Sequence, residues 1–210
     1  MGKIEITKKV LGICATNCYT VVDTETKEAL IIDPADRADV LIRDWKEKGV
    51  TPQAVLLTHG HFDHIGALAG VKKEYPDIKV YAAAAEKEVM ESPALNLSSS
   101  FGAAFTAQAD IYLEDGAEIE VLGRTCKCLL VPGHTKGGMC YYFPEEKVVF
   151  TGDTLFCYSV GRTDFPTGDA RALEEAIREK LFTLPDETLV FPGHDAQTMI
   201  GKEKKGNPYF

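Results

Sequence analysis

The stretch Thr58-His59-Gly60-His61-Phe62-Asp63-His64 places three histidines and one aspartate within six residues. It directly follows the apolar run 54–57, which predicts a short buried strand. Imidazole and carboxylate groups are good ligands for divalent cations such as Zn²⁺. The cluster therefore predicts a metal site, and chance grouping of ordinary core or surface histidines is a poor explanation of it.

The rest of the chain contains three further short motifs with ligand residues. They are Pro132-Gly133-His134-Thr135, Thr151-Gly152-Asp153-Thr154 and Pro192-Gly193-His194-Asp195. With them, all five histidines of the chain lie in candidate metal motifs. Each motif follows a run that predicts a strand, at 129–131, 148–150 and 189–191. Loops at strand ends can converge while the sheets stay rigid, so the pattern favours one multi-ligand site.

Composition limits the class of protein. A chain of 210 residues with a net charge of −9 predicts one globular domain and argues against nucleic-acid binding. No basic start with a long apolar stretch opens the chain, so we expect a cytoplasmic protein with no membrane contact and no need of disulfides for its six cysteines. We expect a monomer or homodimer, and we interpret the basic segment 202–205 as a solvated end.

The hydrophobic pattern predicts two halves, each rich in strands and followed by helices. The first half has predicted strands at 3–10, 18–23, 29–33, 54–57 and 79–82 and helices at 38–48, 65–75 and 84–90. The second has strands at 111–113, 117–122, 125–131, 139–143, 148–151 and 188–191 and a helix at 171–180. This order predicts two sheets packed face to face with helices outside. Residues 93–109 form either a connecting loop or a mobile flap.

These motifs together resemble the metallo-β-lactamase superfamily. The resemblance extends from Asn17-Cys18-Tyr19 to Asn207-Pro208, and Gly161-Arg162-Thr163-Asp164-Phe165 makes it closer to glyoxalase II-like hydrolases of the short, single-domain bacterial type. It implies an α/β (α+β) fold, an αββα sandwich of two mixed β-sheets with helices on the outer faces, in one domain covering residues 1–210.

The resemblance also implies a ligand set for two divalent metal ions. One ion is expected on His59, His61 and His134, and the other on Asp63, His64 and His194. Asp153 is expected to bridge them. Zn²⁺ is the expected metal, with iron and manganese as alternatives. Asp63 and Asp153, the two carboxylates of the set, are the predicted catalytic residues.

The implied chemistry is hydrolysis. Metal-bound water can ionise near neutral pH, and a metal-bridging hydroxide would attack an acyl carbon while a cation stabilises the oxyanion. A thiolate leaving group needs little help from a general acid, and no histidine remains for that role. We therefore expect a small anionic thioester such as S-lactoylglutathione as substrate, with another ester or a lactone as the alternative.

Residues 156–165 follow the bridging aspartate and should line the mouth of the site. The predicted substrate-binding residues are Arg162, Thr163 and Phe165. The Arg162 guanidinium could hold a substrate carboxylate through two hydrogen bonds, or form an internal salt bridge with Asp164 or Asp169. The longer glyoxalase II enzymes have a lysine and a tyrosine where this chain has Arg162 and Asp164, so the thiol they use need not be the thiol used here.

Other members of the superfamily supply rival interpretations. Persulfide dioxygenases carry a similar G-R-T-D-F segment and use one iron held by two histidines and one aspartate, so the ligand residues alone leave this alternative open. A β-lactamase would be exported, which the start of the chain does not indicate. A nuclease would need an inserted domain and a basic surface.

Overall fold

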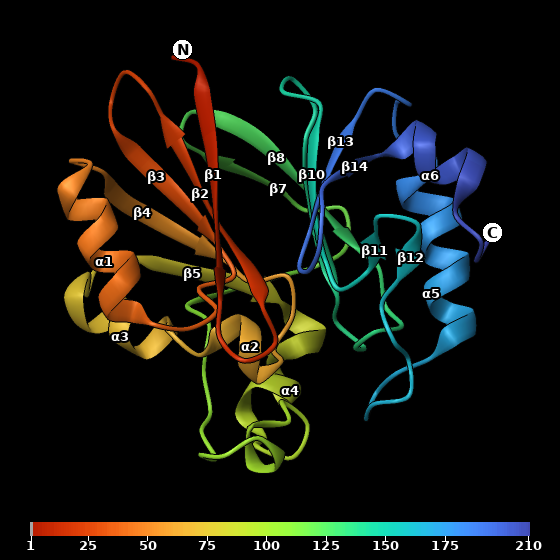
Figure 1. The fold of residues 1–210 in the computed structure, drawn as a ribbon, viewed down its shortest axis with the longest axis horizontal. Helices are drawn as coiled ribbons and strands as arrows, with labels where there is room; N and C mark the ends of the chain where they lie inside the picture. The colour runs from red at the N-terminus through yellow and green to blue at the C-terminus, as the bar shows by residue number, and fades with distance from the viewer. Residues whose placement is uncertain (1) are drawn as a thin grey trace.

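In the computed structural model, which describes residues 2–210, two six-stranded sheets pack face to face with helices on both outer sides (Figure 1). The first sheet has the order β1-β2-β3-β4-β5-β6 and the second the order β14-β13-β10-β9-β8-β7. A short hairpin of β11 and β12 stands beside the second sheet. This is the predicted αββα sandwich of two mixed β-sheets.

The strands of the first sheet are Ile4–Leu11 (β1), Thr16–Asp23 (β2), Glu28–Ile32 (β3), Thr51–Leu56 (β4), Lys79–Ala83 (β5) and Ile111–Leu113 (β6). Those of the second are Glu118–Val121 (β7), Arg124–Leu130 (β8), Met139–Phe143 (β9), Val148–Gly152 (β10), Leu189–Pro192 (β13) and Thr198–Met199 (β14), and the hairpin comprises Leu155–Phe156 (β11) and Ser159–Val160 (β12). Strands β3 to β6 run parallel, as do β10 and β13.

The α-helices are Ala38–Glu47 (α1), Phe62–Ile65 (α2), Leu68–Glu74 (α3), Lys87–Glu91 (α4), Ala170–Ala176 (α5) and Ile200–Gly206 (α6). Short 3₁₀ turns lie at Ala84–Glu86 (η1) and Ser98–Ser100 (η2), and a π-helical turn at Ile177–Leu181 (η3). The predicted helix 65–75 is thus two helices, α2 and α3. In the described part of the chain, no helix is long and apolar enough to span a bilayer.

Three layers of apolar side chains match this architecture. One lies between the first sheet and α1 and α3, centred on the fully buried Trp45. The second lies between the sheets and contains Tyr19, Phe150 and Phe191, whose rings touch one another. The third joins the second sheet to α5 and includes Leu173. Burying both faces of each sheet in this way fixes the spacing between the loops at the sheet ends.

The prediction that residues 202–205 form a solvated end is wrong. They belong to α6, and the Glu203 carboxylate is fully buried. It accepts hydrogen bonds from the Tyr158 backbone N–H at 3.0 Å and from Asn207 Nδ2 at 2.9 Å, and it also contacts the Thr198 hydroxyl. The helical period explains the error, because Glu203 lies three residues after the buried Ile200 and so shares its inner face.

A buried ion network joins the sheets at the end away from the histidine motifs. Arg124, with only 4% of its side chain exposed, pairs with Asp23 at 3.0 Å and with Glu146 at 2.6 Å. Asp23 ends β2 and Arg124 begins β8, so the network ties one sheet to the other. Removing one member would leave the opposite charges buried and unpaired.

We predict that Arg124→Leu lowers the free energy of unfolding by about 3–5 kcal/mol, because two carboxylates lose their partner. Chemical denaturation measures this change. Lys127→Ala removes an exposed pair with Glu118 and should change the same quantity by less than about 1 kcal/mol. Equal effects of the two substitutions would show that the network contributes nothing beyond a surface pair.

Candidate metal centre

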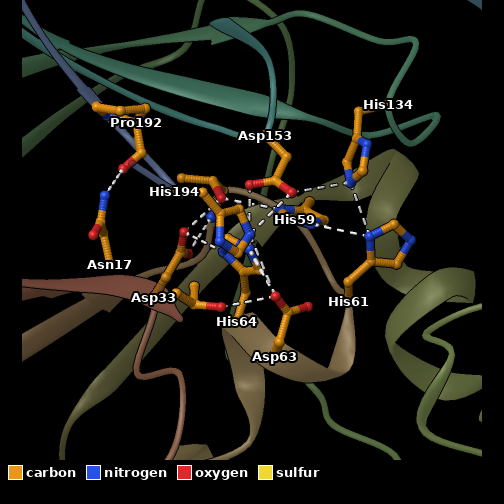
Figure 2. A network of polar contacts seen from close by, with 12 residues as sticks. Asn17, Asp33, His59, His61, Asp63, His64, His134, Asp153, Pro192 and His194 are labelled. Atoms are coloured by element: carbon orange, nitrogen blue, oxygen red, sulfur yellow. Dashed lines mark hydrogen bonds and ion pairs between the residues drawn. The ribbon is translucent and has the colours of Figure 1, made fainter. Parts of the chain in front are cut away.

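All seven predicted ligands come together at one edge of the sandwich, where strands of both sheets end (Figure 2). Their supporting segments are the stretch from β4 into α2, with His59, His61, Asp63 and His64, and the loops after β8, β10 and β13, with His134, Asp153 and His194. Strands β10 and β13 pair in parallel up to Gly152 and Pro192, and the Gly193 N–H donates to the Gly152 carbonyl at 2.8 Å. This register sets Asp153 beside His194.

Three imidazoles form the first half of the centre. His61 Nδ1 lies 3.1 Å from His59 Nε2 and 2.9 Å from His134 Nε2. The other nitrogen of His134, Nδ1, donates to the Arg162 carbonyl at 2.7 Å. His59 Nδ1 donates to Thr58 Oγ1 at 3.1 Å, because that hydroxyl donates its own proton to Asp33. The inward nitrogens of His59 and His134 therefore present lone pairs, which is how imidazoles meet a cation.

The second half contains both carboxylates of the set. His194 Nε2 lies 3.4 Å from an oxygen of Asp63 and 3.4 Å from one of Asp153. His64 Nε2 lies 3.3 Å from Asp153 Oδ1 and 3.6 Å from Asp63. Asp153 also approaches His134 Nε2 at 3.6 Å, so its carboxylate lies between the two halves, as Figure 2 shows.

The polar atoms at the centre fit divalent cations. Among residues 2–210, His64 Nε2 and Asp153 Oδ1 are buried without a hydrogen-bond partner, and they lie 3.3 Å apart. Buried polar atoms are normally paired, so unpaired atoms facing one another indicate a ligand. The ligand atoms of His59, His61 and His134 lie within 4.8 Å of one another, and so do those of Asp63, His64 and His194.

The two halves differ in how they hold protons. Burial and the neighbouring His134 lower the pKa of His61 to about 3, and burial with His64 lowers the pKa of His59 well below its usual range. In the other half burial opposes protonation too, but Asp63, Asp153 and Asp33 raise the pKa of His64 well above normal. At His194 burial also lowers the pKa, but hydrogen bonds to Asp153 and Asp63 raise it more, so that the pKa of His194 rises to about 9.

The carboxylates of Asp63 and Asp153 both favour the ionised form at neutral pH. Burial alone would raise their pKa values, but His64 and His194 lower the pKa of Asp63 to about 2 and that of Asp153 well below its usual range. Two negative charges are therefore fixed beside His64 and His194, whereas the three-histidine half has none of its own except the shared Asp153.

Several supporting residues were not predicted from the sequence. Asp33 is buried and accepts from His64 Nδ1 at 2.8 Å and from the N–H and hydroxyl of Thr58 at 2.8 and 2.6 Å. Thr16 donates to Asp63 Oδ2 at 2.8 Å. Such partners fix the orientation of the ligands. The Thr58 hydroxyl lies between Asp33 and His59 Nδ1 and supports that ligand in the same way.

A cavity of about 410 Å³ opens onto the ligands. Its walls are mostly apolar, and the non-ligand residues in them are Cys14, Phe62, Leu97, Phe101, Phe156, Ser159, Val160, Arg162, Phe165 and Asp195. The Phe62 and Phe101 rings stack at 4.6 Å, which places the segment after α4 in the wall. Of the predicted loop or flap at residues 93–109, Leu97 and Phe101 thus line the cavity.

Two of the three predicted substrate residues, Arg162 and Phe165, line this cavity. Arg162 forms two hydrogen bonds of 2.7 Å with Asp164, and its guanidinium lies 3.8 Å from the centre of the Phe165 ring. Phe165 in turn meets His61 edge-on at 5.8 Å. Thr163 lines a neighbouring cavity of about 340 Å³ instead, which shares Val160 and Arg162 with the first.

The family model described as the metallo-beta-lactamase superfamily matches residues 11–194. This chain belongs to that superfamily. It is 38% identical to the probable metallo-hydrolase YqgX of Bacillus subtilis, over 95% of this chain and 94% of the relative. It is 36% identical to the hydroxyacylglutathione hydrolase GloC of Haemophilus influenzae, over 92% of each chain.

Solved structures agree with this assignment. BLEG-1, described as a B3 metallo-beta-lactamase, superposes with a TM-score of 0.92 at 39% identity, covering 98% of this chain and 99% of the other. TTHA1623 in a di-iron-bound form gives 0.86 at 36% identity, covering 97% and 100%. ETHE1 from Myxococcus xanthus gives 0.79 at 31% identity, covering 97% and 83%. The relatives include metallo-hydrolases, and the residues at the cavity floor could hold metal ions.

We predict that acid weakens the two halves of the centre unequally. Below about pH 9, Zn²⁺ must displace a proton from His194, and it must also displace one from His64, whose pKa the neighbouring carboxylates raise. The pKa of His61 is lowered to about 3 and that of His59 well below its usual range, so these two imidazoles offer free lone pairs at neutral pH. Between pH 9 and pH 6, the affinity of the half with Asp63, His64 and His194 should fall by up to about 100-fold per pH unit, because two protons compete with the ion. The affinity of the three-histidine half should fall much less. Competition with a chelator measures both affinities. Parallel slopes for both ions would contradict this difference.

Proposed function

We propose that this chain is a single-domain dinuclear metallo-hydrolase that cleaves a small thioester, in the manner of a hydroxyacylglutathione hydrolase. The observation that carries the proposal is the convergence of six ligand side chains around a seventh, the Asp153 carboxylate, at the floor of an open cavity. Seven ligands exceed the need of one four-coordinate ion. The name of the Haemophilus influenzae relative supports the substrate class.

In this proposal His59, His61 and His134 hold one ion, Asp63, His64 and His194 hold the other, and Asp153 contacts both. Zn²⁺ fits the mixture of imidazole and carboxylate, and iron is the alternative that the di-iron form of TTHA1623 supports. Two bound cations supply polarisation of a carbonyl oxygen and a water of lowered pKa.

The residues of the chain perform three tasks around that chemistry. Asp63 and Asp153 remain ionised and balance part of the cationic charge, so the site keeps a net attraction for an acyl oxygen or an anion. Thr16 fixes one oxygen of Asp63 through its 2.8 Å hydrogen bond. The aromatic walls, including Phe62, Phe101 and Phe165, exclude bulk water from the acyl group.

A thioester is a suitable substrate for a site that has no free histidine to act as a general acid. All five histidines belong to the proposed ligand set, so none is free to protonate a poor leaving group. A thiolate leaves without that help, whereas an amine would need it. In the cavity Asp195 is the only ionisable carboxyl outside the ligand set among the residues described, and its side chain is exposed.

One observation keeps a second candidate function in view. His59, His64 and Asp153 form a group of two histidines and one aspartate whose ligand atoms lie within 4.8 Å of one another. Such a triad with open positions is the usual site of a mononuclear iron oxygenase. Under this alternative the protein consumes O₂ with a persulfide substrate, and its native metal is one iron per chain.

We predict that protein saturated with metal contains two ions per chain and hydrolyses S-lactoylglutathione, and that Asp153→Ala abolishes hydrolysis and lowers the metal content. Without the negative charge of Asp153, two bound cations would repel each other more strongly. Elemental analysis, a thioester assay and circular dichroism measure metal, activity and fold. One iron per chain with uptake of O₂ would select the alternative, and wild-type activity in the variant would end the dinuclear proposal.

We predict that Arg162→Ala raises the KM for anionic thioesters about tenfold or more and that for neutral thioesters much less, because a charge-assisted pair of hydrogen bonds is lost. Asp164 competes for the same guanidinium edge. Asp164→Asn should therefore lower the KM for the anionic substrates. Equal losses for both substrate types in Arg162→Ala would instead assign Arg162 to holding its own loop.

A further inference from the structure

A fully buried carboxylate outside the ligand set lies behind the three-histidine half. Glu86 ends the turn η1, and its Oε1 accepts from the Gly60 N–H at 2.9 Å. Its Oε2 accepts from the Thr135 hydroxyl at 3.0 Å, and the Gly137 N–H also donates to the carboxylate. Gly60 separates His59 from His61, and Thr135 follows His134. One side chain therefore joins two ligand loops that come from different sheets.

Both loops are shaped to receive this carboxylate. A Cβ on Gly137 would lie 2.4 Å from Glu86 Oε2 and 2.5 Å from the Glu86 backbone nitrogen. A Cβ on Gly60 would lie 2.7 Å from Met90 Cγ. Glycine at these positions allows the backbone to approach closely enough for its N–H groups to reach the carboxylate. All the donors are backbone or hydroxyl groups, so no ligand nitrogen is diverted from the centre.

The other half of the centre has separate supports. His64 is oriented by Asp33 at 2.8 Å, and Asp63 by Thr16 at 2.8 Å. His194 follows Gly193, whose N–H bonds to the Gly152 carbonyl. None of these contacts involves Glu86, so a change at Glu86 acts first on the loops of His59, His61 and His134.

We propose that Glu86 is a positioning residue that sets the spacing of His59, His61 and His134, and thereby the affinity of that half for its ion. The inference rests on the proposed ligand set. Buried N–H groups that lose their hydrogen-bond acceptor are costly, so the loops depend on the Glu86 oxygens that their donors reach. The loops would relax to pair these groups elsewhere and carry the imidazoles away from a common point.

The test compares metal affinity in the two halves. In Glu86→Gln, one carboxylate oxygen is replaced by an amide NH₂ group, which cannot accept a hydrogen bond from the same donor. Loss of such an outer partner typically weakens metal binding about 10- to 100-fold. We expect this loss for Zn²⁺ in the three-histidine half and a change below about threefold in the other. Chelator competition measures the affinities, and anomalous diffraction from partly stripped crystals assigns each to its half.

Glu203→Gln is the matched control, because Glu203 is equally buried and hydrogen-bonded but contacts no ligand loop. It should leave both zinc affinities unchanged. Thr135→Val removes one of the three donors and should give a smaller loss in the same half, while Thr135→Ser, which keeps the hydroxyl, should restore binding. This pair keeps the inference testable if Glu86→Gln does not fold.

Folded Glu86→Gln with both affinities unchanged, or with both lowered alike, would overturn the inference. Loss of both zinc affinities in Glu203→Gln would also overturn the inference. It would show that removing any buried carboxylate weakens metal binding, whether or not the carboxylate contacts a ligand loop. A wild-type protein that binds no divalent ion would refute the proposed ligand set itself, a result that is distinct from a wild type with two ions and an insensitive Glu86.

Discussion

The position of the candidate metal centre depends on hydrogen bonds that join the two sheets, and two of them meet at the Pro192 carbonyl. Asn17 Nδ2 donates to it at 2.9 Å and the Tyr19 hydroxyl at 2.7 Å, so β2 of the first sheet is fixed to the end of β13 in the second (Figure 2). His194 follows two residues later, while Thr16 at the start of β2 holds Asp63. A shift of one sheet against the other would separate ligands that must meet within a few ångströms, so the packing of Tyr19 against Phe150 and Phe191 is part of the site.

The same geometry places the negative charges of the site on one side of it. The carboxylates of Asp63 and Asp153 lie beside His64 and His194 and raise their pKa values, while His59 and His61 are buried among other imidazoles and have lowered ones. In the proposed ligand set, His59 and His61 therefore favour the neutral form that binds a cation, whereas His64 and His194 favour the protonated form. Asp153 belongs to both halves, so occupation of one half changes the field in the other.

The sequence predicted the sandwich and the convergence of the ligands because both depend on local signals, namely apolar runs and histidines directly after them. It did not indicate Asp33, Thr16 or Glu86, which lie far along the chain from the ligand groups they support and in no motif with a fixed spacing. The burial of Glu203 was missed for a related reason. A charged side chain is assigned to solvent until its partners, here Tyr158 and Asn207, are known from the fold.

Substrate choice must come from the walls of the cavity rather than from its floor. Structures that superpose closely with this one carry names as different as a B3 metallo-beta-lactamase and ETHE1, so the shared fold does not select the substrate. In this chain one wall is the stacked pair Phe62 and Phe101, and the other is the segment with Phe156 and Arg162. The Tyr158 N–H in the turn of the β11–β12 hairpin donates to Glu203 of α6, so the segment that carries Phe156 is held in place by a contact outside the cavity.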